Sequence, residues 1–460
     1  MLWGSWSLVL LVVYIATVAR DRVVNDVLSA ALAAWRIATT GEPWFDGFPL
    51  EQIPTAPHQH LWTGLADNGH VAVFRSPGAI AAGVPAYLFG RGTEPQDFSV
   101  VPAGVLAAVL VVAALLLYAR ALLTVLPTAQ VVAALTALAL TTPIWSNAAN
   151  SLWPHTVTLV GIAGMAWACS RERWWLLGLF GGVALWGRLH AVLVVALLGL
   201  GLALWRRRAV IAVRAGTVSA GFLGLAFVWT HEMYGKWEPT GGYDASSVAT
   251  NATTGGPGGS GLVDRTVNQL GLWISPDRGI LVWTPVLLLL LPAVVRSWRV
   301  LPDWSRLLLA AGLAYTFVQG LINHFGGGVN FYGYRLTLEL LACSFPAYAM
   351  AATRAGPVGR RLLGPVLGLQ LGVISLGAVT ESFFVPVTEA WTDSSLALAL
   401  REFPWLIGWL ALTTLIGALA GQVYADRFGP LSAPAGPAAP ASPRAAHPGR
   451  GSGRAAPGRR

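Results

Sequence analysis

Long apolar runs recur along almost the whole of this 460-residue chain, and most are long enough to cross a bilayer as helices. A chain with 55% hydrophobic and 11% charged residues cannot keep so much apolar surface inside one soluble core. The sequence therefore predicts an all-α fold, a polytopic membrane helical bundle of about 12 spans (roughly 11 to 13). The predicted spans cover residues 2–19, 100–118, 124–142, 155–170, 174–204 (two segments), 209–230, 279–295, 306–323, 335–352, 362–380 and 403–424.

Arginine clusters in alternate loops indicate how the bundle is oriented. The positive-inside rule makes these loops cytoplasmic, although Arg20 and Arg22 alone favour the opposite side for the first loop. The clusters are Arg206 to Arg208 with Arg214, then Arg296, Arg299 and Arg306, then Arg354, Arg360 and Arg361, and the tail beyond Arg427. We therefore expect loops 20–99, 143–154, 231–278, 324–334 and 381–401 to face outward from a cell membrane.

The formal charge of +9 does not indicate a nucleic-acid partner, because much of it lies in the tail. Residues 430–460 carry five arginines and no acid in a Pro/Ala/Gly-rich segment that cannot build a core. We predict one membrane domain over residues 1–425 and a disordered cytoplasmic tail over 426–460. Cys169 and Cys343 lie in apolar surroundings and are expected to pack as small hydrophobes.

Ionisable residues gather in the predicted outward loops, which indicates a functional site on the outer face. Charged groups are costly inside the hydrocarbon, and transporters usually place them near the bilayer midplane. Arg188, in "LWGRLHAVL", is the main charged residue that lies among the predicted spans, at a predicted break between two of them. A lipid or sugar translocator nevertheless remains an alternative.

The segment "VVNDVLSAALAAWRIATT" places an acid where the first span emerges. Leu28, Leu32 and Trp35 repeat at helical spacing, so residues 26–38 are predicted to form an amphipathic helix in the membrane interface. Asp26 would lie in its first turn. The simplest explanation is structural, with Asn25 as N-cap and Asp26 complementing the helix dipole.

Asp26 is part of the first of four motifs that follow one another along the chain. They are the acid-headed helix ending in "TTG" with "FRSPGAIAAGVPAYLFG", then "IWSNAANSLWPH", "SPDRGILVWTPVLLLLLPAVV" and "NHFGGGVNFYGYRLTLELLACSFPAYA". In this order they resemble motifs of the GT-C superfamily of polyprenyl-phosphate-sugar-dependent glycosyltransferases. Within that superfamily they resemble bacterial enzymes that are similar to dolichyl-phosphate-mannose mannosyltransferases. The resemblance covers most of residues 1–425.

The resemblance implies an integral membrane transferase acting in cell envelope biogenesis. Such an enzyme takes a sugar from a polyprenyl-phosphate donor and passes it, with inversion, to a glycan, lipid or protein acceptor. Asp26 matches the general base by position. Arg335, Arg278 and His155 are candidate donor-phosphate ligands, although arginines at helix ends also snorkel to headgroups. Tyr332, Tyr334, Glu232 and Asp244 are candidate substrate-binding residues.

The chain departs from the family pattern at the metal-binding acids, because Asn25 precedes Asp26 and the second loop carries His155 instead of an acid. A divalent cation would need other ligands. The candidates are Asp26, His58, His60, Asp67 and His70, whose spacing is not that of a tight metal motif. Loop histidines are more often simply solvated.

Loop 231–278 contains "SSVATNATTGGPGGSG" and is predicted to be flexible, either as a lid over bound substrate or as a tolerated insert. A catalytically inactive GT-C-like scaffold is a further alternative to the enzyme. Mannose, arabinofuranose, glucose and galactose are all compatible, because pocket shape rather than a motif selects the sugar.

Overall fold

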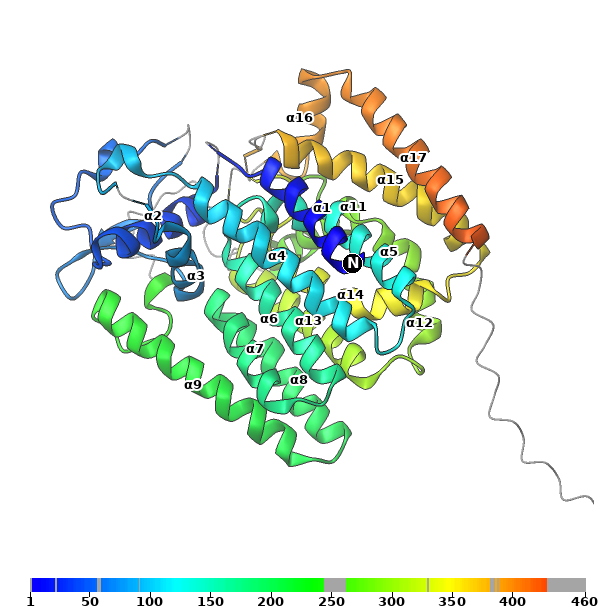
Figure 1. Ribbon diagram of the computed structural model, residues 1–460, viewed down its shortest axis with the longest axis horizontal. Coiled ribbons are helices and arrows are strands. Elements are labelled where there is room, and N and C mark those ends of the chain that lie inside the picture. The colour runs from blue at the N-terminus through cyan, green and yellow to red at the C-terminus, as the bar shows by residue number, and fades with distance from the viewer. Residues whose placement is uncertain are drawn as a thin grey trace, which may run out of the picture.

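The computed structural model describes residues 2–20, 23–55, 59–90, 92–243, 262–328, 331–380, 385–386 and 389–427 (Figure 1). Helices account for 72% of the residues and strands for 2%, which confirms the all-α class. The predicted tail, residues 426–460, lies outside the described residues from position 428 onward. The elements are α1 (Leu2–Ala16), α2 (Asn25–Thr40), β1 (Thr63–Leu65), β2 (Val71–Val73), α3 (Pro77–Tyr87), α4 (Val101–Leu122), α5 (Thr128–Leu140), the π-helical turn η3 (Ile144–Ala149), α6 (Pro154–Ser170), α7 (Trp174–Gly187), the short turn η4 (Leu189–Ala191), α8 (Val192–Trp205), α9 (Ala209–Tyr234), α10 (Leu262–Ile274), α11 (Ile280–Trp283), α12 (Val286–Ser297), α13 (Asp303–Ile322), α14 (Leu338–Ala352), α15 (Pro357–Val379), α16 (Ser395–Glu402) and α17 (Leu406–Arg427).

Every predicted apolar run coincides with one or two helices, but the number of spans is not confirmed. Among the described residues, five helices are long and apolar enough to cross a membrane, namely α4, α9, α13, α15 and α17. Several other apolar helices are only 10–17 residues long. In the run 279–295, a proline explains the short helices. Pro285 has no N–H and disfavours a helical conformation at Thr284, so the run divides into α11 and α12.

Two of the arginine-bearing regions that were predicted to share one side meet in the structure. Arg206, after α8, contacts Asp303 Oδ2 at 2.6 Å and Glu172 Oε1 at 2.7 Å. Glu172 lies between α6 and α7, Arg206 lies between α8 and α9, and Asp303 is the first residue of α13. The alternating path predicted from the sequence is therefore consistent with the arrangement of α6, α7, α8 and α13.

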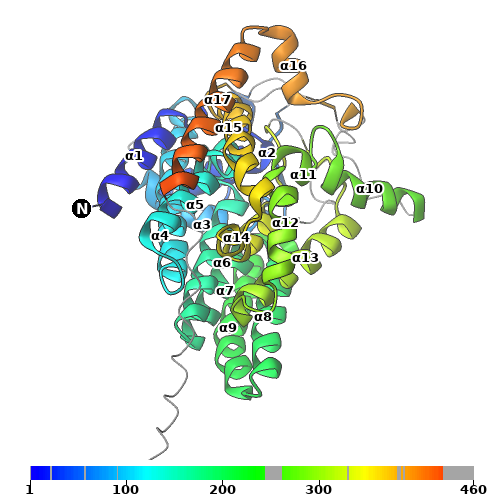
Figure 2. The same cartoon turned by 90° about the vertical axis from the view of Figure 1, so that its right-hand side faces the viewer.

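Helices α15 and α17 form a closely packed pair along one side of the bundle (Figures 1 and 2). Glycines allow the backbones to approach, since a Cβ at Gly368 would lie 2.5 Å from the Thr413 carbonyl oxygen. Small residues at helix contacts are typical of membrane bundles, where packing rather than hydrophobic exclusion holds helices together.

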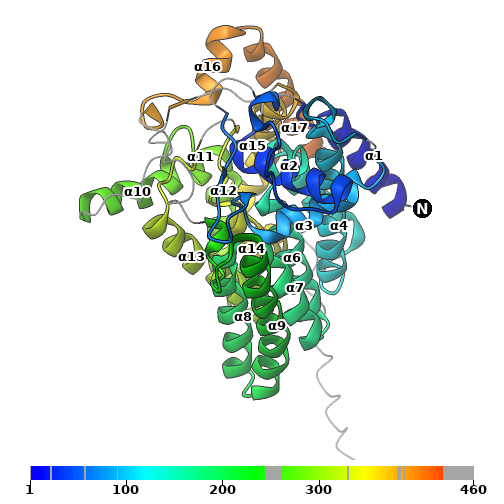
Figure 3. The ribbon, with the colours of Figure 1, turned by 90° about the vertical axis from the view of Figure 1, so that its left-hand side faces the viewer.

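A cap formed by α2, the β1–β2 hairpin and α3 lies against the bundle at the ends of α4 and α6 (Figures 1 and 3). The predicted helix 26–38 is present as α2, but protein rather than lipid covers its apolar face. Trp35 is only 2% exposed and packs against Phe48 and Phe98. Trp35, on the face predicted to lie in the membrane interface, is therefore buried within the protein, because the loops around α2 fold over it.

The N-cap expectation was wrong. Val24 caps α2 without a side-chain hydrogen bond, and Asn25 is its first residue. The Asn25 Oδ1 atom instead accepts a hydrogen bond from the His60 backbone N–H at 2.9 Å, which ties the following loop to the helix. Asp26 does lie in the first turn, as predicted.

The loop predicted over 231–278 contains a helix, α10, which projects from the side of the bundle (Figure 2). Its polar residues Asn268 and Gln269 bond to backbone carbonyls of α13, while Leu262 and Val263 are largely exposed. The Gly/Ser/Thr-rich part, residues 244–261, lies outside the described residues, as does Asp244.

Candidate functional site

Asp26 lies between two arginines. Its Oδ1 is 2.7 Å from Nη2 of Arg75, and its Oδ2 accepts a hydrogen bond from Nη1 of Arg335 at 2.6 Å. The three side chains are 21%, 10% and 14% exposed, so the cluster is partly open to its surroundings. The structure thus brings together Asp26 and Arg335, two residues singled out in the sequence, and adds Arg75.

Three separate segments bring these charges to one place. Asp26 is in the first turn of α2, while Arg75 lies between β2 and the start of α3. Arg335 precedes α14 in a loop held by η3: the Ser146 hydroxyl and the Asn147 amide donate to the Tyr332 and Tyr334 carbonyls at 3.2 and 3.0 Å. The loop that carries Arg335 is therefore positioned by side chains of the second predicted outward loop.

Aromatic rings lie beneath both guanidinium groups. Arg75 stacks over Trp62 at 4.3 Å, and Arg335 lies 5.6 Å from Trp153 and 5.4 Å from Phe331. Such stacking favours a planar cation while leaving its edge N–H groups to donate in the plane. The arrangement therefore suits a bidentate anion better than a solvated surface arginine would.

The charges around Asp26 lower its pKa. Burial alone raises it, but the positive charges of Arg75 and Arg335, together with the Arg335 hydrogen bond, outweigh burial and hold the pKa below the ordinary value of 3.8. The carboxylate is thus ionised, and both of its oxygens are bound by arginines. Two guanidinium groups facing one carboxylate leave positive charge for a second anion.

His155 lies in a neighbouring buried chain rather than at this cluster. Its Nδ1 is 2.7 Å from Glu339 Oε1, and its Nε2 is 2.9 Å from Nη1 of Arg188. Because a guanidinium only donates, Nε2 must accept and Nδ1 must donate to Glu339. Both ring nitrogens are therefore engaged within the protein. Arg188 lies at the break between α7 and α8, as the sequence predicted.

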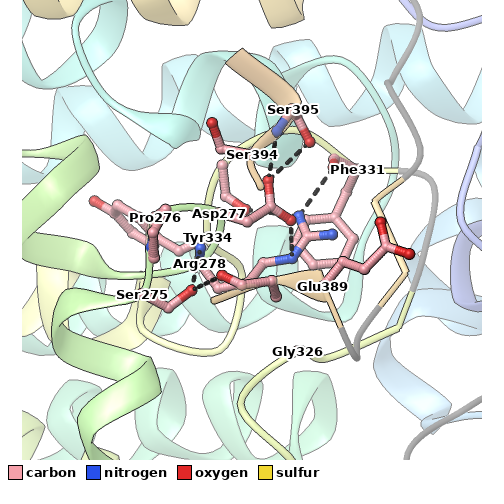
Figure 4. A network of polar contacts seen from close by, with 12 residues as sticks. Ser275, Pro276, Asp277, Arg278, Gly326, Phe331, Tyr334, Glu389, Ser394 and Ser395 are labelled. Carbon is pink, nitrogen blue, oxygen red and sulfur yellow. Dashed lines mark hydrogen bonds and ion pairs between the residues drawn. The ribbon is translucent and has the colours of Figure 1, made fainter. Parts of the chain in front are cut away.

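Arg278 belongs to a buried internal network (Figure 4). Its Nε is 2.9 Å from Asp277 Oδ2, and its Nη1 donates to the carbonyls of Phe331 and Gly333 at 3.2 and 3.1 Å. Asp277 Oδ1 in turn accepts from the Ser395 hydroxyl at 2.9 Å. We refer to Asp277, Arg278 and Ser395 as the latch, because they join the loop after α10 to the start of α16 and to the backbone at residues 331–333. Burial lowers the pKa of Arg278, and the Asp277 charge opposes that shift.

The other candidate substrate-binding residues occupy different surroundings. Tyr332 and Tyr334 are each 1% exposed, and the Tyr334 hydroxyl bonds to that of Thr284 at 2.7 Å. Glu232 is exposed near the end of α9, where its carbonyl accepts a hydrogen bond from Asn68. The tyrosines thus lie in the same loop as Arg335, whereas Glu232 lies at the end of α9 beside Asn68.

The candidate metal ligands are not gathered into one site. Asp67 lies 3.6 Å from Lys236, and His70 pairs with Asp46 at 2.5 Å. His60 contacts Asn25 through its backbone, and His58 lies outside the described residues. Among the residues that the structure describes, no three His, Cys, Asp or Glu side chains form a cluster suited to a metal ion.

Sequence reasoning missed Arg75 and Glu339. Arg75 stands in "FRSPGAI", where a cation directly before a Ser-Pro helix start could have been flagged as facing the same loops as Asp26. Glu339 stands in an otherwise apolar run, and a buried acid there requires a partner, which His155 supplies. The local sequence around Arg75 or Glu339 did not indicate which distant residue either side chain would contact.

A scan against protein-family models found no match, and searches among curated proteins and among solved structures returned none either.

Proposed function

We propose that this protein is a membrane glycosyltransferase that moves a sugar from a polyprenyl-phosphate donor to an envelope acceptor at the outer face. The observation that carries the proposal is the contact of Asp26 with two stacked arginines, Arg75 and Arg335. A carboxylate and a phosphate offer similar oxygen pairs to a guanidinium fork. The Asp26 carboxylate therefore occupies the place that a donor phosphate would take.

Binding of the donor would then activate Asp26. When Arg75 and Arg335 turn to the phosphate oxygens, the carboxylate loses the charges that lower its pKa, and its pKa rises towards the range of a useful base. Asp26 accepts the proton of the acceptor hydroxyl as its oxygen attacks the anomeric carbon. The bond from that carbon to the phosphate oxygen breaks, and its electron pair leaves with the phosphate, which the two arginines stabilise.

An apolar groove of about 550 Å³ supports a lipid-linked donor. It lies between α5, α12, α14, α15 and α17, and its lining is formed mainly by Leu and Ala side chains. One of its lining residues, Thr284, bonds to the Tyr334 hydroxyl, and Tyr334 is next to Arg335. An isoprenoid chain in this groove would end near the proposed phosphate site.

The test is transfer from a panel of labelled polyprenyl-phosphate sugars by purified protein in lipid nanodiscs. Asp26→Asn retains the size of the side chain, so it should fold with a similar melting temperature while transfer falls by roughly 10²–10⁴-fold. Undiminished transfer by Asp26→Asn would eliminate Asp26 as the base. Absence of transfer from every donor would favour the translocator or the inactive scaffold instead.

The proposed outer face has its own test. A cysteine at the exposed position Thr240 should react with a membrane-impermeant thiol reagent in intact cells, whereas one placed after Arg427 should not. Background labelling of the native cysteines should be low, because Cys169 and Cys343 are both buried. Labelling beyond Arg427 alone would reverse the orientation and remove the site from the outer face.

A further inference from the structure

We propose that α10 is an interfacial helix whose exposed apolar side lies in one boundary of the bilayer. Val263, Val267, Leu270 and Ile274 recur at i, i+4, i+7 and i+11, so they follow one side of the helix. They are 74%, 41%, 46% and 49% exposed. A continuous exposed apolar surface marks a contact with another phase or partner. The inference goes beyond the proposed function and holds whether or not the protein transfers a sugar.

The opposite side of α10 is polar and is bound to the end of α13. The Asn268 amide donates to the carbonyls of Gly320 and Asn323, the second at 2.6 Å. The Gln269 amide donates to the Phe317 carbonyl at 2.7 Å. These bonds fix which side of α10 faces the bundle, so the apolar side faces away from it. A surface helix of a soluble protein has the reverse arrangement.

Helix α13 indicates the level at which α10 is attached. It has 20 residues, which rise about 30 Å, the thickness of the hydrocarbon core. Its first residue, Asp303, pairs with Arg206 at 2.6 Å on the side predicted to be cytoplasmic. The carbonyls at residues 317–323 therefore lie at the opposite boundary. From there α10 extends sideways, whereas α8 and α9 run along the bundle (Figures 2 and 3).

The apolar surface of α13 continues at this level. Near its end, Phe317, Leu321 and Ile322 are 58%, 38% and 48% exposed, as expected for a span that faces lipid. Helix α10 crosses α13 beside them, since a Cβ at Gly320 would lie 2.6 Å from the Gln269 Nε2 atom. The exposed side of α10 is thus adjacent to a surface that lipid already covers.

Length and charge favour a position along the boundary of a neutral bilayer. The 13 residues of α10 are too few to span the hydrocarbon, which needs about 20. Its charged residues, Asp264 and Arg265, are of opposite sign, so attraction to anionic lipid is not what holds it. Burial of the apolar side among headgroups and the first part of the acyl chains supplies the binding energy.

This position has a consequence for the loop that carries Arg335. Leu272, on the inner part of α10, is 1% exposed and packs with Phe325 and Leu336. Leu336 directly follows Arg335, and Ser275, which follows α10, begins the segment of the latch. Helix α10 therefore holds this loop at the depth of the headgroups.

The test uses Val267→Cys and Arg265→Cys, each labelled with an environment-sensitive fluorophore in phosphatidylcholine nanodiscs. The two positions are about 200° apart around the helix and both are exposed, so Arg265→Cys is the matched control. A nitroxide attached near the lipid headgroup should reduce the fluorescence at Val267 at least about twofold more than at Arg265, because the apolar side of an interfacial helix reaches about 5–10 Å into this boundary. The native Cys169 and Cys343 are buried.

Aqueous iodide supplies the opposing measurement. A Val267 label quenched by iodide as strongly as the Arg265 label would place the apolar side in water and overturn the inference. Protection from both iodide and nitroxide would show that protein covers this side, which also overturns it. Leu270→Cys reports on the same side if Val267→Cys does not fold. Because neither quencher depends on sugar transfer, this inference can fail or succeed independently of the proposed function.

Discussion

The arginines of two aspartate–arginine clusters lie close to the ring of Phe331, and the two clusters differ in how far their side chains are exposed. Arg278 lies 3.9 Å from the Phe331 ring and Arg335 lies 5.4 Å from it. In the latch, Asp277 is 0% exposed and Arg278 donates to two backbone carbonyls. Around Asp26 the side chains are 10–21% exposed, and the Asp26 carboxylate contacts the guanidinium groups of Arg75 and Arg335.

The difference shows how one residue pair can serve two roles. A fully buried ion pair that also bonds to backbone carbonyls holds loops together, because no ligand can reach it without unfolding them. An ion pair whose side chains are partly exposed can exchange its partners for an anion. Exposure, rather than residue type, therefore assigns Arg278 to the fold and Arg335 to the proposed site.

The largest expected effect is on stability in the latch. Arg278→Ala leaves Asp277 buried without its cation and should lower the free energy of unfolding by about 3–5 kcal/mol. Denaturant unfolding of detergent-purified protein measures it. Arg75→Ala is the matched control and should cost only about 1 kcal/mol, because its pair is partly exposed and Asp26 keeps Arg335. Equal losses in the two variants would erase the distinction between the clusters.

Activity should show the opposite order. Arg335→Ala is expected to reduce sugar transfer by about 10- to 100-fold, the value of a charged hydrogen bond, with little change in melting temperature. Arg335→Lys should retain an intermediate activity, because lysine keeps the charge but lacks the fork. Near-normal transfer by both variants would return Arg335 to the helix-end arginines that contact headgroups.

A smaller effect is expected from the neutral member of the latch. Ser395→Ala removes a hydroxyl that donates to Asp277 at 2.9 Å, while the Ser395 backbone N–H still donates to the same oxygen at 2.8 Å. The expected cost is about 1–2 kcal/mol of stability with transfer retained. Loss of transfer at unchanged stability would show that the latch acts in the reaction itself.

The smallest effect concerns pH. Because the pKa of Asp26 in the folded protein lies below its ordinary value of 3.8, its ion pairs contribute their full stability above that pH and lose it as the pH falls further. The difference in unfolding free energy between wild type and Asp26→Asn should therefore stay constant from about pH 8 to 5 and shrink below 3.8. A difference that already changes between pH 7 and 5 would mean that Asp26 is not held by the arginines.

The helices could be predicted because each depends mainly on its own segment. A long apolar run must satisfy its backbone internally wherever it packs, so composition alone placed α4, α9 and α13. Local chemistry also accounts for the break at Thr284–Pro285 and for Arg188 between α7 and α8. The resemblance to GT-C enzymes likewise suggested Asp26 and Arg335 as members of one site, and the structure places the two side chains in contact.

Partner choice was decided only by the tertiary structure. Asp26 and Arg335 are 309 positions apart, and no periodicity links residues at that separation. The sequence suggested the same role for Arg278 as for Arg335, but the fold surrounds the first with carbonyls and leaves the second beside Asp26. Loops over α2 likewise buried Trp35, which the local pattern had assigned to the interface. Helix formation is a property of neighbouring residues, whereas the surroundings of a charge depend on which distant loops the packed helices bring to it.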